Sequence, residues 1–131
     1  FAASLATIKK FRKISLQNKL IKYGKQIKSG WTDISRNTGV KILIAGIDPI
    51  PQFNFEKNHI VKSTFFNQEM LKRGYLVNNR LCTTKAYDKK IINKYLNNTY
   101  DVFNTISKFE KKGKDLPLEG PLRHETFKRL V

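Results

Sequence analysis

The sequence predicts an α+β domain in which two long helices and one shorter helix pack on a small antiparallel sheet of three to four strands. Two series of apolar residues recur at alternating spacings of three and four, which is the pattern of an amphipathic helix. Between them lie short segments rich in β-branched and aromatic residues, separated by a proline-rich turn. When the helices pack against the sheet, the apolar stripe of each helix and the apolar face of the sheet are both buried.

The first long helix is predicted by an apolar stripe in the N-terminal part of the chain: Leu5, Ile8, Leu16, Leu20, Tyr23, Ile27, Trp31 and Ile34. Ser15 interrupts this stripe, and it either caps a second helix or lies on the polar face of one continuous helix. Gly39 is the expected C-terminal stop. Gly24 and Gly30 each weaken the helix by about 1 kcal/mol relative to alanine.

The next two elements are predicted to form an antiparallel pair of strands. Residues 40–47 are β-branched and apolar, and residues 52–56 alternate between polar and apolar. The intervening Asp48-Pro49-Ile50-Pro51 forces a turn, because each proline fixes its own φ and steers the preceding residue away from the helical region. We therefore expect Phe53 and Phe55 to face the core.

A shorter helix is predicted from residue 63 to a stop at Gly74, followed by a third strand over residues 75–77. Residues 81–83 are a candidate fourth strand. The second long helix begins near Asp88, whose negative charge favours a helix start. Its core face follows the series Ile92, Leu96, Thr99, Phe103 and Ile106, widened by Ile91, Tyr95, Val102 and Phe109.

A chain of 131 residues fits one domain with a tail. We place the domain at residues 1–113 and an extended, proline-containing tail at 114–131, with a short helix over 124–130 as one interpretation of its last residues. No apolar run reaches the roughly 18–20 residues needed to cross a membrane. The single cysteine, Cys82, excludes an internal disulfide and indicates a reducing, cytoplasmic setting, with Cys82 expected as a small buried side chain.

The formal charge of +16, from 26 basic and 10 acidic residues, raises the alternative of a basic module that binds nucleic acid. The basic residues are mostly lysines in short pairs spread along every helix, whereas arginine is the residue suited to bidentate phosphate contacts. The aromatic residues follow the apolar stripes and are expected in the core, not on a stacking surface. A solvated surface is therefore the favoured interpretation, and nucleic acid is the less favoured partner.

Several segments taken together resemble a known enzyme family. They are the opening residues 1–7, the Phe-rich helix 65–73 closing on Gly74, the short strand 75–77, and Thr83-Thr84 leading into the helix that starts near Asp88. In this order they resemble the C-terminal domain of class III pyridoxal-phosphate-dependent aminotransferases, nearest to the glutamate-1-semialdehyde 2,1-aminomutase branch. The resemblance covers roughly residues 1–110 and implies the small C-terminal domain of fold-type I enzymes.

The resemblance implies that the chain holds part of an enzyme without its reacting centre. In this family the lysine that binds the cofactor lies in a large domain upstream, so pyridoxal phosphate belongs to the parent chain, and we assign no catalytic or cofactor-binding residue here. The expected partner is that missing large domain, in a parent that forms a homodimer. Trp31, Phe1 and Phe127 are candidates for an apolar docking patch.

Arg80 is the candidate substrate-binding residue. In several branches of the family an arginine near the strands before the last helix binds a substrate carboxylate, and a planar guanidinium offers paired donors for that purpose. The alternative is a surface or ion-paired arginine. The chain departs from close relatives at residues 83–87, Thr-Thr-Lys-Ala-Tyr, where relatives carry Ser-x-Ala-His-Thr. The missing histidine favours a relative acting on a sugar or another carbonyl substrate over the tetrapyrrole-pathway enzyme itself.

The two histidines, His59 and His124, have no cluster of carboxylates, cysteines or further histidines at metal-ligand spacing. We therefore expect surface or hydrogen-bonded histidines and no metal site. Arg123 and His124, together with Arg129, offer a second arrangement of groups that contacts an anion if the tail folds back on the parent enzyme.

Overall fold

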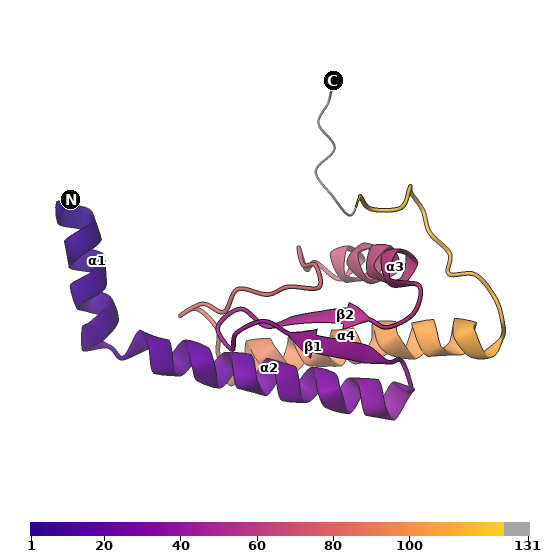
Figure 1. Ribbon diagram of the computed structural model, residues 1–131, viewed down its shortest axis with the longest axis horizontal. Helices are drawn as coiled ribbons and strands as arrows, with labels where there is room; N and C mark the ends of the chain where they lie inside the picture. Colours follow the sequence, from indigo (N-terminus) through magenta and orange to yellow (C-terminus); the bar gives the residue numbers. More distant parts are fainter. Residues whose placement is uncertain (125–131) are drawn as a thin grey trace, which may run out of the picture.

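The computed structural model describes residues 1–124, which form four helices and a two-stranded sheet (Figure 1). In chain order these are α1 (Ala2–Lys13), α2 (Leu16–Thr38), β1 (Ile42–Ala45), β2 (Gln52–Phe55), α3 (His59–Lys72) and α4 (Lys89–Lys111). Helices α2, α4 and α3 lie side by side against one face of the sheet, while α1 projects away from it. The α+β class is as predicted.

The two long helices run parallel and pack closely. Gly30 of α2 lies against the Leu96 side chain of α4, and Ser107 near the end of α4 donates a 2.6 Å hydrogen bond to the carbonyl of Thr38 at the end of α2. Between them, Nε1 of Trp31 donates to the Tyr95 hydroxyl at 3.1 Å. The contacts advance in the same direction along both helices, which fixes the parallel arrangement.

An aromatic cluster centred on Phe53 joins the sheet to the helices. The Phe53 ring lies 4.8 Å from Trp31, 5.3 Å from Phe55, 5.4 Å from Phe66 and 5.7 Å from Phe103, measured between centroids. All four pairs meet edge to face, a favoured geometry for aromatic rings. The inward direction of Phe53 and Phe55 is thus confirmed, whereas Trp31 is fully buried and the prediction that it belongs to an exposed docking patch is wrong.

The first helical stripe is broken at Ser15, so α1 and α2 are separate helices. Ser15 takes the left-handed conformation, with φ 47°, and its side chain makes no capping hydrogen bond. The break is therefore a backbone turn between the helices. Gly39 ends α2 as predicted, with φ 78° and its N–H bonded to the carbonyl of Ser35.

The sheet has two strands where the sequence predicted three to four. Residues 75–77 and 81–83 are not strands. Instead, an extended segment follows the edge of β2: the carbonyl of Asn79 accepts from the Phe53 N–H, and the N–H groups of Leu81 and Thr83 donate to the carbonyls of Pro51 and Pro49. Because Pro49 and Pro51 have no N–H to return a bond, the contacts with Leu81 and Thr83 run one way, and the segment makes only an isolated bridge with β2, between Arg80 and Gln52.

This edge segment still alternates as a strand would. Leu81 and Thr83 are buried, while Cys82 between them points to solvent. The prediction of a buried Cys82 is therefore wrong, because its position in the alternation, and not its apolar character, decides its exposure.

The tail up to residue 124 lies along α3 (Figure 1). Leu116 and Leu118 pack against the core, and the Gln68 side chain bonds both the carbonyl of Pro117 and the N–H of Glu119. The predicted short helix over residues 124–130 and the candidate patch residue Phe127 lie outside the described part of the chain.

The glycines of α2 give a test of this packing. A Cβ on Gly24 would lie 1.5 Å from the backbone carbonyl oxygen of Asp48, whereas a Cβ on Gly30 would meet only side-chain atoms of Leu96, the nearest at 2.5 Å. We predict that Gly24→Ala lowers the free energy of unfolding by about 3 kcal/mol, because backbone must move. Gly30→Ala should stay within about 1 kcal/mol, because Leu96 can adjust and alanine favours helix. Urea denaturation of both variants checks this, and equal losses would contradict it.

Candidate functional site

Arg80 lies in the edge segment, opposite Gln52 of β2. Its side chain is exposed, and its Nε donates to the Gln52 side-chain oxygen at 3.2 Å. Its backbone N–H donates to the Asn78 side chain at 2.6 Å, which holds the turn before it. Within residues 1–124 Arg80 belongs to no ion pair of the kind that Lys28 makes with Asp48. The guanidinium is therefore held by Gln52 through Nε, while its two terminal amino groups face solvent.

Arg80 stands at the edge of an open sheet face. The outward residues of β1 and β2 alternate with the core residues and are Leu43, Ala45, Gln52 and Asn54. Leu43 is 59% exposed, and the Gln52 amide contacts the Asn54 side chain at 3.4 Å. This face combines an apolar half on β1, an amide pair on β2 and a cation at the edge. Such a surface can receive a carboxylate at Arg80 while its apolar half meets another protein surface.

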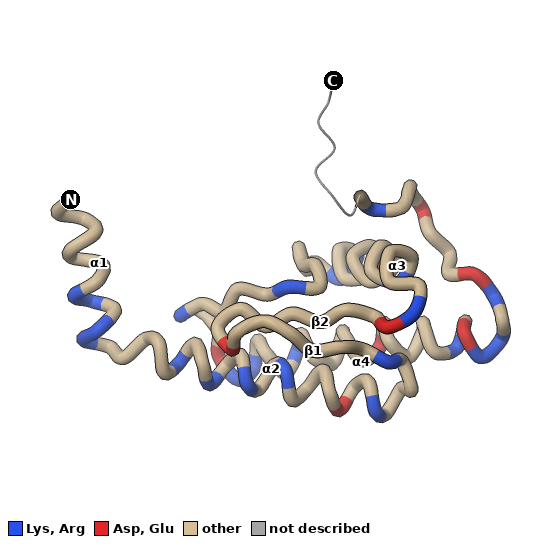
Figure 2. Tube along the Cα trace, viewed as in Figure 1, with Lys and Arg blue, Asp and Glu red and all other residues tan. Residues whose placement is uncertain are grey.

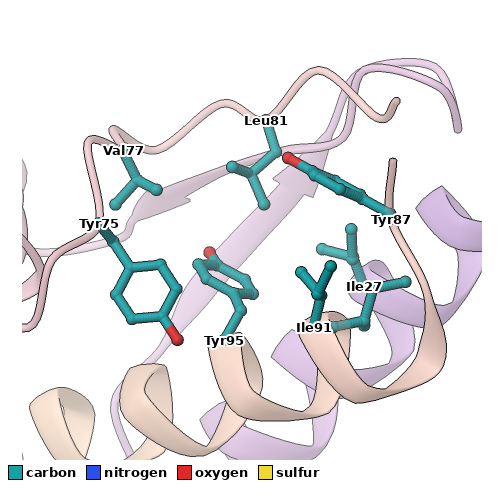
Figure 3. Close-up of a pocket in the computed structure, with 8 residues that line it drawn as sticks. Ile27, Tyr75, Val77, Leu81, Tyr87, Ile91 and Tyr95 are labelled. Carbon is teal, nitrogen blue, oxygen red and sulfur yellow. The ribbon is translucent and has the colours of Figure 1, made fainter. Parts of the chain in front are cut away.

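An apolar cavity of about 110 Å³ lies on the inner side of the same segment (Figure 3). Its lining comes from α2, α4 and the segment that precedes α4: Ile27, Tyr75, Val77, Leu81, Tyr87, Ile91, Ile92 and Tyr95. The Tyr95 hydroxyl accepts from Trp31, and the Tyr75 hydroxyl accepts from Asn98 at 3.3 Å. The hydroxyls of Tyr95 and Tyr75 are thus engaged by neighbours, and most of the lining is ring and aliphatic carbon.

A second cavity, of about 200 Å³, opens at the other end of the sheet and is lined by charged side chains. It contains Lys62, whose side chain is 5% exposed and forms an ion pair with Glu110. The sequence analysis missed this group. The available signal was the placement of Lys62 on the same helical stripe as Phe66 and Met70, at successive spacings of four.

Neither of these cavities fits pyridoxal phosphate. The apolar cavity has no cation for a phosphate and no carboxylate for the ring nitrogen. In the charged cavity the amino group of the buried Lys62 is engaged by Glu110, and no second carboxylate among residues 1–124 lines the cavity to face a ring nitrogen. We therefore assign no chemical step of such a cofactor to the residues described here.

Within residues 1–124, neither histidine belongs to a group that could hold a metal ion. His59 Nδ1 accepts from the Phe55 N–H at 3.2 Å, and its Nε2 lies 3.3 Å from the Arg123 guanidinium. Arg123 is thus turned toward α3 and also bonds Thr64 through its backbone N–H. Among residues 1–124 no group of three or more histidine, cysteine, aspartate or glutamate side chains is placed to hold a metal ion, and no helix is long and apolar enough to cross a membrane.

The arrangement of helices and sheet is shared with part of a solved protein that carries pyridoxal phosphate (PLP). That structure is the PLP internal aldimine form of the Sphingopyxis sp. MTA144 FumI protein, with a TM-score of 0.64 and 18% sequence identity. The similarity covers 72% of this chain and 23% of that one, so the chain matches less than a quarter of its neighbour. No known family model and no curated protein matches the chain. The likeness shows a shared fold.

The Tyr95 hydroxyl predicts how stability depends on pH. Burial raises the pKa of Tyr95 far above its ordinary value, and burial also raises the pKa of Tyr87. Above about pH 10 the unfolded chain can release these protons while the folded chain retains them. The contribution of these two tyrosines to the free energy of unfolding should therefore be constant below about pH 10 and fall above it.

Tyr95→Phe should reduce this alkaline loss and also cost about 1–3 kcal/mol at neutral pH, because the buried indole N–H of Trp31 loses its acceptor. Tyr100→Phe, on the exposed side of the same helix, is the matched control and should leave stability near the original value. Denaturation midpoints between pH 7 and 11 measure both effects. If Tyr95→Phe lost stability above pH 10 as steeply as the original protein, Tyr95 would not be the cause of the alkaline loss.

Proposed function

We propose that this chain is the C-terminal domain of a PLP-dependent aminotransferase or aminomutase, nearest to the glutamate-1-semialdehyde 2,1-aminomutase branch. The observation that supports it best is the fold shared with a PLP-carrying protein, which the chain matches over less than a quarter of that protein's length. A domain of this size without its own cofactor site fits a part that shapes a substrate pocket. Catalysis then belongs to the parent chain, which we place in the cytoplasm, and the domain alone is inactive.

Helix α1 supports a neighbouring large domain as the partner. None of its residues is buried, and Leu5 and Ile8 are each 51% exposed while Phe1 is fully exposed. A helix of 12 residues is marginal by itself in water, so it needs a surface that covers its apolar side. The large PLP-binding domain of the same chain is the partner we propose, within a parent that forms a homodimer.

Arg80 is the residue to which we assign a substrate carboxylate. Gln52 holds its Nε and Asn78 holds its backbone, so the two terminal amino groups of the guanidinium are presented together. Two parallel N–H donors bind a carboxylate more strongly than neutral hydrogen bonds do. The open sheet face beside it would form one wall of the substrate entrance.

A basic module that binds nucleic acid is the second candidate, and the distribution of charge favours it. Residues 1–32 contain eight basic residues and no acidic one, and Figure 2 shows this as blue without red along α1 and most of α2. Aromatic residues that could stack on bases are few on the described surface, where Phe1 and Tyr100 are the large exposed ones. We therefore favour the enzyme function over binding of nucleic acid.

Absorbance of the full-length parent tests the proposal. We expect purified parent with pyridoxal phosphate to show a band of the lysine-bound cofactor, which borohydride converts into a stable covalent adduct. The isolated chain studied under the same conditions should show no such band. If the parent also lacks the band, the aminotransferase assignment falls, and salt-dependent binding of nucleic acid becomes the measurement to make.

For Arg80 we predict that Arg80→Gln in the full-length enzyme raises KM for a carboxylate substrate by roughly tenfold or more, since a charge-assisted pair is lost. Arg80→Lys should restore part of the affinity, because the charge remains but the fork does not. Arg36→Gln is the matched control, because that exposed arginine pairs with Asp33 on the surface, at 3.3 Å. Steady-state kinetics of the three variants decide, and an unchanged KM in Arg80→Gln would assign Arg80 to the surface.

A further inference from the structure

The charged cavity at the end of the sheet, which we name the lysine cavity, gathers residues from five places in the chain. It is lined by Gly39 after α2, Lys41 before β1, Lys57 before α3, Lys62 within α3 and Glu110 near the end of α4. Its volume is about 200 Å³. Pockets for drug-sized ligands hold about 300–1,000 Å³, so this cavity suits a smaller group.

Lys62 forms the floor of the lysine cavity. Its side chain is 5% exposed, and its ammonium lies 5.9 Å from the centre of the Phe55 ring. A buried ammonium is costly unless it is paired, and Glu110 is its partner. The Glu110 side chain is 42% exposed, however, so it covers the ammonium from the solvent side and does not enclose it.

The lysine cavity carries an excess of positive charge. Three ammonium groups meet one carboxylate, which leaves a net charge of +2 (3 − 1). Lys41 and Lys57 are exposed, and within residues 1–124 neither belongs to an ion pair. Their charge is therefore available to a ligand.

Carbonyl groups at the ends of α2 and α4 do not need these lysines. Lysines near a helix C-terminus often bond the last free carbonyls. Here the Ser35 carbonyl accepts from the N–H of Gly39, the Thr38 carbonyl accepts from the Ser107 hydroxyl, and the carbonyls of Lys108 and Phe109 accept from the N–H of Lys112. These carbonyls are therefore capped by groups other than the lysines of the cavity.

The start of α3 adds to the positive field of the lysine cavity. Asn58, the residue before the helix, has φ 52°, and its side chain makes no capping hydrogen bond. The first turn of α3 also has no acidic residue. The positive end of the helix dipole is therefore not neutralised by the helix itself, and Lys57 and Lys62 flank it.

We propose that the lysine cavity binds a small oxyanion of the phosphate class, either free or as the phosphoryl group of a small molecule. Lys41 and Lys57 supply exposed ammonium donors, Lys62 supplies a buried one, and Glu110 opposes binding as the single carboxylate. This site is separate from Arg80 and from the apolar cavity, and it does not depend on the proposed enzyme function.

Calorimetric titration of the full chain with inorganic phosphate, at constant ionic strength set by sodium chloride, tests the proposal. We expect saturable binding, and we expect the double variant K41Q/K57Q to weaken it by about tenfold or more, because two charge-assisted contacts are lost. K89Q/K94Q is the matched control, because it removes the same charge from the exposed face of α4 and should change the affinity less than twofold. Glycerol phosphate in a parallel arm distinguishes a phosphoryl group from the free ion.

Glu110→Gln gives the opposite sign and separates binding from a structural role. Removing the one carboxylate should raise phosphate affinity several-fold, whereas a purely structural Glu110 would lower stability without strengthening the binding of any anion. The titration uses the chain without pyridoxal phosphate, because the phosphate group of that molecule would compete for the lysine cavity. The proposal would be overturned if K41Q/K57Q and K89Q/K94Q weakened phosphate binding equally. It would also be overturned if titration with phosphate released no more heat than titration with sodium chloride of the same ionic strength.

Discussion

The packing of one phenylalanine ring, Phe53, is the constraint on which the rest of the structure depends. Its ring contacts aromatic residues from α2, α3 and α4, so one β-strand residue fixes the positions of three helices. Phe53 is completely buried, and the deletion of a buried aromatic side chain typically costs about 3–5 kcal/mol. A sheet of two strands is marginal by itself. Here the helices stabilise it through this ring.

The fold could largely be predicted from periodicity, and the exceptions have physical causes. The stripes gave α2 and α4, and the alternation around Phe53 gave the inward face of β2. The candidate fourth strand, residues 81–83, was overpredicted because apolar composition does not show whether a neighbour can return hydrogen bonds. Pro49 and Pro51 cannot, so the segment around Leu81 lies beside β2 without forming a ladder.

The candidate site was less predictable than the fold. Arg80 was selected by its place in the chain, but its support by Gln52 depends on register across β2, which the sequence does not show. The lysine cavity was missed for a different reason. Its charges come from residues up to 69 positions apart, at Lys41 and Glu110, and only the fold brings them together. The spacing of residues in the sequence reveals a site on one helix or strand more readily than a site formed by several of them.

Two groups of lysines on this chain differ in their surroundings. Lys28, Lys62 and Lys72 each have a carboxylate within 4 Å and contribute to the packing of the domain. The lysines of α1 and of the first half of α2 have no acidic residue near them in the sequence, because the first one is Asp33. Like charges along α1 and the first half of α2 repel one another, so any surface that brings negative charge to these helices stabilises them. A second copy of so basic a chain cannot supply that charge with the same face. A partner surface that carries acidic residues can, and the same contact would cover the exposed apolar side of α1.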